Sequence, residues 1–346
     1  MKRKIYIVSH SSIDLVSVLN LYERYSRQCE VTILISGTEE NLRFLQSVNV
    51  SESALRFLNF ESRNNRNKKR LARYLHQLVV EKKTLDRLIA EISANRDNEV
   101  FFHSYDNDPH AGYLVSRVAR TNRVTLVDVL GIRPKSLRFR DLLTRLGVKN
   151  AVHLAIFNSV FGRLFMLSGT RSYPIFSLDL ERVNITRETG SARGNATALA
   201  KHRYHVPGNG KNVVFLYSDS FGVCTEVHES VNREIVECLA RNGLEIHVKI
   251  HPQSRRPGFL DEYNVRYIPQ CVPFELVDLT NVSLVVGIAG ASLVCTGEVP
   301  TVSVAKLVYR EDSDYYLSAI AQLRQNPAIV FVSSMDELEN VIGECH

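Results

Sequence analysis

The sequence contains no apolar run that approaches the roughly 18 residues needed for a membrane-spanning helix. A secretory signal is also missing, because the basic residues at the start lead directly into a short strand-like stretch, Ile5 to Val8. We therefore expect a cytoplasmic protein, with any membrane contact made peripherally at the inner face.

Cysteine and metal-ligand patterns are equally sparse. The six cysteines include no CxxC pair and no Cys/His spacing of the kind that binds zinc, so neither a disulfide nor a structural zinc ion is expected. The sequence also lacks the GxGxxG, P-loop, HExxH and EF-hand motifs. We expect no metal and no cofactor, and a ligand would be held by a less regular group of residues.

Positive charge is in excess, with 43 Lys and Arg against 37 Asp and Glu. It is concentrated in residues 63–73, in residues 133–149, and at Arg255 and Arg256. Such clusters imply an acidic partner, which could be an anionic membrane surface, an anionic substrate or nucleic acid. A solvated face explains the first cluster equally well. Few aromatic residues accompany the basic ones, so nucleic acid is not the expected partner.

The chain of 346 residues is too long for one compact core, and its pattern of elements repeats. Short, continuously apolar strands alternate with helical patterns, which predicts parallel sheets buried on both faces. We predict an α/β protein with two doubly wound, Rossmann-like domains, at residues 1–185 and 212–315. Residues 186–211 are polar and rich in glycine, typical of a linker, and residues 316–346 are predicted to be a helical region that could cross back to the first domain.

A strand rich in β-branched residues ends at His251 and Pro252. Proline cannot extend the hydrogen-bonded ladder, so the imidazole would be fixed at the carboxyl end of the strand. An imidazole there can donate a hydrogen bond to a phosphate near neutral pH. A purely structural turn explains the pair when it is taken alone. Arg255 and Arg256 would either add positive potential or solvate the turn.

Two further groups of residues could contribute to an anion site. Gly290, Ala291 and Ser292 follow another apolar strand and would open a short helix, whose N–H groups and hydroxyl suit an anion. A tight turn capped by Ser292 is the alternative. Glu275 follows Pro273, predicted at the first helical position, and could accept hydrogen bonds from a ribose diol. The helix dipole alone also favours a glutamate there.

The order VKIHP, IPQCVPFEL and SLVVGIAGASL resembles the C-terminal half of bacterial sialyltransferases, over about residues 212–305. The resembled families are the capsule polysialyltransferases and the lipooligosaccharide sialyltransferases, which have a GT-B fold and bind CMP-sialic acid. The resemblance implies that the donor is held by His251, Pro252, Glu275, Gly290, Ala291 and Ser292. The loop departs from the paired serines of these families, because only Ser292 matches.

An inverting glycosyl transfer needs a carboxylate that takes the proton of the acceptor hydroxyl. The resembled families supply it from an acidic-acidic-Gly motif after a strand of the N-terminal domain. Asp128 is in the corresponding place, with Gly131 three residues later, so the resemblance implies that Asp128 is the base. The motif is less compact than that of the families, and a helix-capping aspartate explains it nearly as well.

Polar residues after two other predicted strands are candidates for binding the acceptor. His103, Asp106 and Asp108 follow a buried strand, and one of them could be the base instead of Asp128. A turn before Pro109 explains them too, and their spacing matches no standard metal site.

The other acceptor candidates belong to the first strand and to a basic helix. His10, Ser11 and Ser12 follow the first strand, where a helix-capping serine is the alternative. Arg133 begins a basic helical pattern that would suit an anionic or lipid-linked acceptor, although its apolar stripe is more typical of core packing.

The sequence therefore predicts an inverting, metal-independent glycosyltransferase with Asp128 and His251 as catalytic residues. It would transfer sialic acid or a related nonulosonic acid from a CMP-linked donor to a glycan acceptor in bacterial surface polysaccharide or lipooligosaccharide synthesis. The alternatives are a CDP-polyol phosphotransferase, a UDP-sugar GT-B enzyme, and a non-catalytic protein that binds an anionic glycan or nucleic acid.

Overall fold

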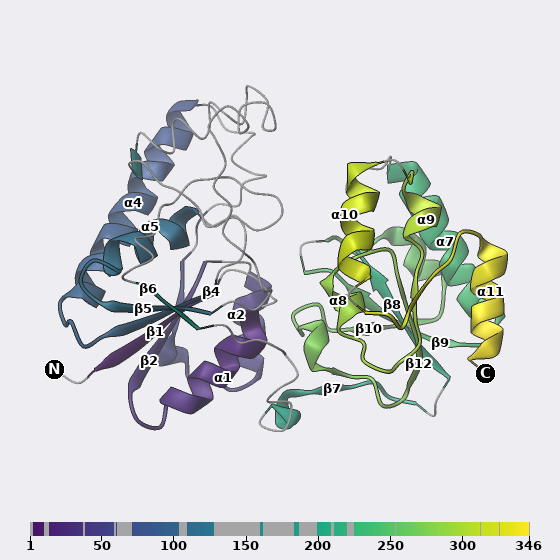
Figure 1. Cartoon of the computed structure of the whole chain (residues 1–346), viewed down its shortest axis with the longest axis horizontal. Coiled ribbons are helices and arrows are strands. Elements are labelled where there is room, and N and C mark those ends of the chain that lie inside the picture. Colours follow the sequence, from purple (N-terminus) through teal and green to yellow (C-terminus); the bar gives the residue numbers. More distant parts are fainter. Residues whose placement is uncertain are drawn as a thin grey trace. The chain divides into compact units, whose positions relative to one another are not determined.

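The computed structural model forms two compact units, Met1–Leu199 and Ala200–His346 (Figure 1). The residues that it describes are 3–9, 14–36, 39–58, 60, 71–103, 109–127, 160–161, 183–186, 199–208, 211–219, 225–252, 254–311, 313–324 and 326–345. None of the helices in these ranges is long and apolar enough to cross a membrane.

The first unit contains a parallel sheet with strand order β3-β2-β1-β4-β5-β6. Its strands are β1 (Lys4–Ser9), β2 (Glu30–Ile35), β3 (Leu55–Phe57), β4 (Glu99–His103), β5 (Arg123–Val127) and β6 (Val183–Thr186). Its described α-helices are α1 (Leu15–Tyr25), α2 (Glu39–Ser47), α4 (Leu71–Ser93) and α5 (Pro109–Val118).

Helices cover both faces of this sheet (Figure 1). Tyr6 of β1 belongs to a core cluster with Leu85 of α4 and Leu114 of α5. Ile5 points to the opposite face, because side chains alternate along a strand, and it is fully buried. On that side α1 packs on β1 and β2. Continuous apolar strands are thus explained by burial on both faces.

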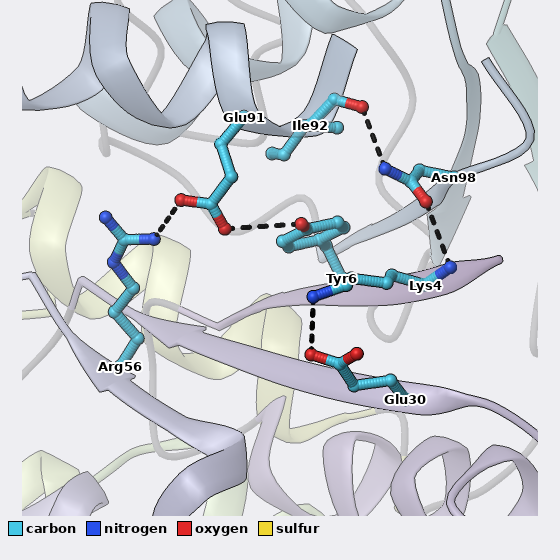
Figure 2. A network of polar contacts seen from close by, with 7 residues as sticks. All are labelled: Lys4, Tyr6, Glu30, Arg56, Glu91, Ile92 and Asn98. Carbon is cyan, nitrogen blue, oxygen red and sulfur yellow. Dashed lines mark hydrogen bonds and ion pairs between the residues drawn. The ribbon is translucent and has the colours of Figure 1, made fainter. Parts of the chain in front are cut away.

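Polar contacts link β1 and β3 to α4, and β1 to β2 (Figure 2). Arg56 of β3 donates to the Glu91 carboxylate at 2.7 Å, and the Tyr6 hydroxyl donates to the same carboxylate at 3.3 Å. Burial, together with Glu91, raises the pKa of Tyr6 to about 12. Lys4 pairs with Glu30 at 2.5 Å at the amino ends of β1 and β2. Exposed pairs of this kind contribute little stability individually.

The second unit contains a parallel sheet with strand order β10-β9-β8-β12-β13-β14. Its strands are β8 (Asn212–Tyr217), β9 (Glu245–Ile250), β10 (Val265–Ile268), β12 (Val282–Gly287), β13 (Thr301–Ser303) and β14 (Ile329–Phe331). Its described α-helices are α7 (Thr225–Arg241), α8 (Ala291–Val294), α9 (Ala305–Val308), α10 (Asp314–Leu323) and α11 (Met335–Glu344). A separate pair joins β7 (Tyr204–His205) to β11 (Val277–Asp278).

Numbered along the chain, the six strands of each large sheet have the same order, 3-2-1-4-5-6. This is the order of the doubly wound Rossmann fold. It confirms the predicted α/β class with two Rossmann-like sheets. The strand order reverses between β1 and β4 in the first sheet and between β8 and β12 in the second.

Two segments differ from what the sequence predicts. Residues 316–346, predicted to be a helical region, include β14, which pairs with β13, and α11, which packs on α7, so this segment is part of the second unit. The β-branched and aromatic residues of β14 explain the strand. Within the predicted linker 186–211, residues Tyr204 and His205 form β7, which pairs with β11.

Candidate active site

The strands β9, β8 and β12 are adjacent and parallel, so their carboxyl ends lie side by side at one edge of the second sheet. β8 is the first strand of this sheet along the chain, and the next strands are added on one side of it and then on the other. Sheets of this kind bind ligands at the carboxyl ends of the strands where the order reverses. The residues that follow these three strands are therefore the candidates for a site.

His251 comes directly after β9, and its backbone N–H donates to the carbonyl oxygen of Tyr217 at 2.8 Å. The contact with β8 thus continues to His251, and the half-buried Pro252 begins the turn. The residue as a whole is exposed, although protein atoms surround its imidazole. This partial burial and the nearby Lys249 lower the pKa of His251, and Asp219 acts in the opposite direction. A neutral imidazole has one ring N–H, which can donate a hydrogen bond.

Lys249 lies one residue before the end of β9 and is only 6% exposed. Its Nζ donates to the carbonyl oxygens of Ile250 at 3.2 Å and Gln270 at 3.0 Å. A buried ammonium held this way adds positive potential beneath the carboxyl edge of the sheet. Sequence analysis missed this residue, although a lysine between Val248 and Ile250 in a strand is itself a signal.

The end of β12 is packed closely against β8. A Cβ atom added to Gly287 would lie 3.0 Å from the Cβ of Leu216, so no other residue fits there without movement. The loop that follows is held from β13, because the Ser303 hydroxyl donates to the carbonyl oxygen of Ile288 at 2.7 Å. The start of the loop toward α8 is therefore constrained by β8 on one side and by β13 on the other.

Gly290, Ala291 and Ser292 begin the short helix α8, as the sequence predicts. The N-cap is Gly290 rather than Ser292, so the alternative in which Ser292 caps the helix is wrong. Gly290 has a φ of 140°, which L-residues rarely adopt, and a Cβ atom there would meet nothing within 4 Å. A ligand could approach the backbone on this open side. Ser292 is half-buried in the same turn.

Glu275 lies in a single 3-10 turn, Phe274–Leu276, immediately before β11. Pro273 is the N-cap of this turn, not the first position of an α-helix as predicted, because the chain enters β11 after one turn. Burial raises the pKa of the Glu275 carboxyl, and Lys249 acts in the opposite direction. One 3-10 turn has only a small dipole, so the dipole explanation for this glutamate loses weight.

Asp219 is a further residue that sequence analysis missed. It is exposed after the end of β8, and its backbone N–H donates to the Ser254 hydroxyl at 2.8 Å. Burial lowers the pKa of both His228 and His251, and the Asp219 carboxylate works against this lowering in each case. The signal in the sequence is an ionisable residue soon after an apolar strand, and His251 has a similar position at the end of β9.

His103, at the end of β4 in the first unit, is only 1% exposed. Its Nδ1 lies 3.1 Å from the carbonyl oxygen of Val8 and therefore donates, which leaves Nε2 to accept from the Ser17 hydroxyl at 3.0 Å. The ring thus joins β4 to β1 and α1. Protein groups occupy both ring nitrogens, which favours a structural role for His103, and its role in binding the acceptor stays a prediction.

His110, which follows the same predicted cluster, is also buried. Its Nε2 lies 2.8 Å from a carboxylate oxygen of Glu81, and the ring of Phe60 stacks on it with centroids 4.5 Å apart. The contact between His110 and Glu81 links α5 to α4. The remaining predicted site residues lie outside the described ones, namely Asp128, the predicted base, and the acceptor candidates His10, Ser11, Ser12, Asp106, Asp108 and Arg133.

Solved structures similar to this chain include UDP-GlcNAc 2-epimerase from Methanocaldococcus jannaschii, with a TM-score of 0.47, 12% identity, and coverage of 99% of this chain and 92% of that chain. UDP-GlcNAc 2-epimerase from Neisseria meningitidis bound to UDP-GlcNAc has a TM-score of 0.47, 12% identity and coverage of 99% and 90%. Spinosyn rhamnosyltransferase complexed with thymidine diphosphate has a TM-score of 0.44, 12% identity and coverage of 99% and 91%. No family model and no curated protein matches the sequence. The fold assignment rests on the strand order of the two sheets.

Proposed function

We propose that the protein is an inverting, metal-independent GT-B glycosyltransferase that takes sialic acid or a related nonulosonic acid from a CMP-linked donor. The observation that carries the proposal is the position of His251 and of Gly290–Ser292 at the ends of the two strands that flank β8. Neighbouring strands are about 4.8 Å apart, so the carboxyl ends of β9 and β12 lie roughly 10 Å apart. A phosphate that accepts from the His251 side chain on one side and from the start of α8 on the other would fit between these strand ends.

In this proposal the site acts mainly on the departing CMP. Negative charge develops on the phosphate as the bond to the sugar breaks, and fixed donors that stabilise this charge supply much of the rate. His251 would donate through its ring N–H, and the backbone N–H groups at the start of α8 and the Ser292 hydroxyl would donate from the other side. Lys249 would add positive potential from below. Glu275 would accept hydrogen bonds from the ribose hydroxyls.

The acceptor side of the reaction rests on the sequence resemblance. Asp128 would take the proton of the attacking hydroxyl, and Arg133 with the residues after the first and fourth strands would contact the glycan. We propose an anionic or lipid-linked glycan as acceptor, used by a protein that binds peripherally to an anionic membrane.

The outer side of α4 supports this membrane proposal. Arg73, His76, Val80, Lys83 and Arg87 are exposed at intervals of three and four residues, which forms one stripe along the helix, called the α4 stripe below. Val80 is 50% exposed. Among the described residues Arg73, Lys83 and Arg87 have no ion-pair partner. Cations beside an exposed aliphatic side chain suit a surface of anionic lipid headgroups.

Nucleotide selectivity tests the donor. The melting temperature would be measured with CMP, CDP, UDP and GDP at equal concentration, because a ligand that binds only the folded state raises it. We expect CMP to give the largest rise, and CMP-sialic acid to release CMP faster than a CDP-polyol. A larger rise with UDP would replace the CMP donor with a UDP-sugar. No rise with any nucleotide would contradict the proposal.

A further inference from the structure

Gln270 follows β10, which lies on the side of β9 away from β8. Its side-chain nitrogen donates to the carbonyl oxygen of His251 at 2.7 Å and to that of Ser254 at 2.9 Å. A carboxamide NH₂ has two hydrogens, so both are used on the turn that begins at His251. The Lys249 ammonium donates to the backbone oxygen of Gln270 at 3.0 Å and holds this residue in turn.

The turn after His251 is therefore held from both sides of β9. On the β8 side, the His251 N–H donates to Tyr217 at 2.8 Å, and the Asp219 N–H donates to the Ser254 hydroxyl at 2.8 Å. On the β10 side, only the Gln270 side chain among the described residues makes the hydrogen bonds to the turn carbonyls. The Ser254 N–H closes the turn by donating to the His251 carbonyl at 2.9 Å.

These contacts restrict where the imidazole can lie, because they hold the backbone from which it extends. With its backbone N–H and its carbonyl both bonded, the backbone of His251 has little freedom, and the direction of its Cα–Cβ bond is set. Rotation about the side-chain torsions remains, restricted to a few rotamers. Loss of the Gln270 amide would remove one of the two hydrogen bonds described for the His251 carbonyl and would leave the one from the Ser254 N–H, while the pairing with Tyr217 would persist.

We propose that Gln270 is a positioning residue that holds His251 in the orientation needed to meet the donor phosphate. What His251 does in the reaction rests on the proposed function, whereas the holding of its ring rests on the contacts above. Displacement of a reacting group by about 1 Å can cost roughly a hundredfold in rate, so a half-buried glutamine remote from the donor could matter for turnover.

The first experiment does not depend on activity. The Cε1–Hε1 NMR signal of His251, identified by its loss in H251A, would be titrated with pH in the full chain, in Q270A and in Q270M, which keeps a similar length and no charge but cannot donate. We expect the His251 signal and its titration midpoint to change in both variants and to stay unchanged in Q46A, which removes an exposed glutamine of α2. The signal of His205 would be unchanged in all. An unchanged His251 signal in Q270A would overturn the proposal.

The second experiment is a double-mutant cycle on CMP release from CMP-N-acetylneuraminate. We expect Q270A to lose about tenfold and H251A about a hundredfold, with the double variant equal to H251A, because Gln270 acts only through His251. Additive losses would overturn the positioning role. If H251A kept the full rate, the proposed function would fail, and the NMR result would still decide whether Gln270 holds the ring.

Discussion

At the scale of single residues, two opposite charges act on His251. Burial and the Lys249 ammonium lower the pKa of the imidazole, and the Asp219 carboxylate raises it. The net effect is a ring that is less often charged than an ordinary histidine, so it would work as a neutral hydrogen-bond donor until an anion arrives. Binding of a phosphate nearby would favour the imidazolium form, because an opposite charge stabilises it.

Removal of the Asp219 charge and removal of the Lys249 charge should therefore move the pKa of His251 in opposite directions. In D219N the pKa should fall, since the stabilising carboxylate is lost, and in K249M it should rise, since the repelling ammonium is lost. An NMR titration of the His251 ring in each variant measures both changes. D336N, an aspartate on α11, is the control and should leave the midpoint in place. Shifts of the same sign in D219N and K249M would contradict the electrostatic account.

At the scale of elements, the sequence predicted those boundaries that a single residue enforces. β9 ends before the His251-Pro252 pair because proline cannot continue the ladder, and α8 begins after a glycine whose backbone angle other residues avoid. β7 was missed because two residues are too few to show a period, and pairing with β11 is what makes it a strand. Periodicity along the chain carries no information about such a partner.

The residues of the candidate site also fall into those that the sequence predicts and those that it does not. His251, Glu275 and Gly290–Ser292 could be predicted as candidates because each follows a recognisable strand end or turn. Lys249 and Gln270 were missed because their importance lies in contacts between β9 and β10, which no spacing along the chain reveals. The contacts of His103 could not be predicted for the same reason, since nothing in the sequence shows that neighbouring elements bond both nitrogens of a histidine at a strand end.

The α4 stripe yields a prediction at the scale of one helix. The variant R73A/K83A/R87A should lose binding to vesicles that contain phosphatidylglycerol, by about a hundredfold in partition coefficient, since each Lys or Arg near an anionic membrane contributes about 1 kcal/mol. Vesicle sedimentation at low ionic strength measures this loss. R241A/R266A/R324A, which removes three exposed arginines of the second unit, is the matched control. Equal binding by both variants would contradict a membrane role for α4.

At the scale of the whole molecule, each unit has the parts of an independent domain. Both sheets have the complete Rossmann strand order. In the second unit, one face of the sheet packs with α7 and α11, and the other packs with residues such as Phe274, Leu293 and Leu323. Among the residues that the structure describes, both core clusters are built from this unit, and each proposed donor contact also comes from it.

The segment Ala200–His346 should therefore fold on its own and keep the nucleotide site. A domain of about 150 residues buries enough surface to be stable alone. We expect cooperative thermal unfolding of this fragment and a rise in its melting temperature with CMP comparable to that of the full chain, whereas CMP should not stabilise residues 1–199. A folded fragment that CMP does not stabilise, beside a full chain that it does, would mean that the nucleotide needs residues of the first unit. Asp128 and the residues near it would then be the first to substitute, because the donor site would not be confined to the edge of the second sheet.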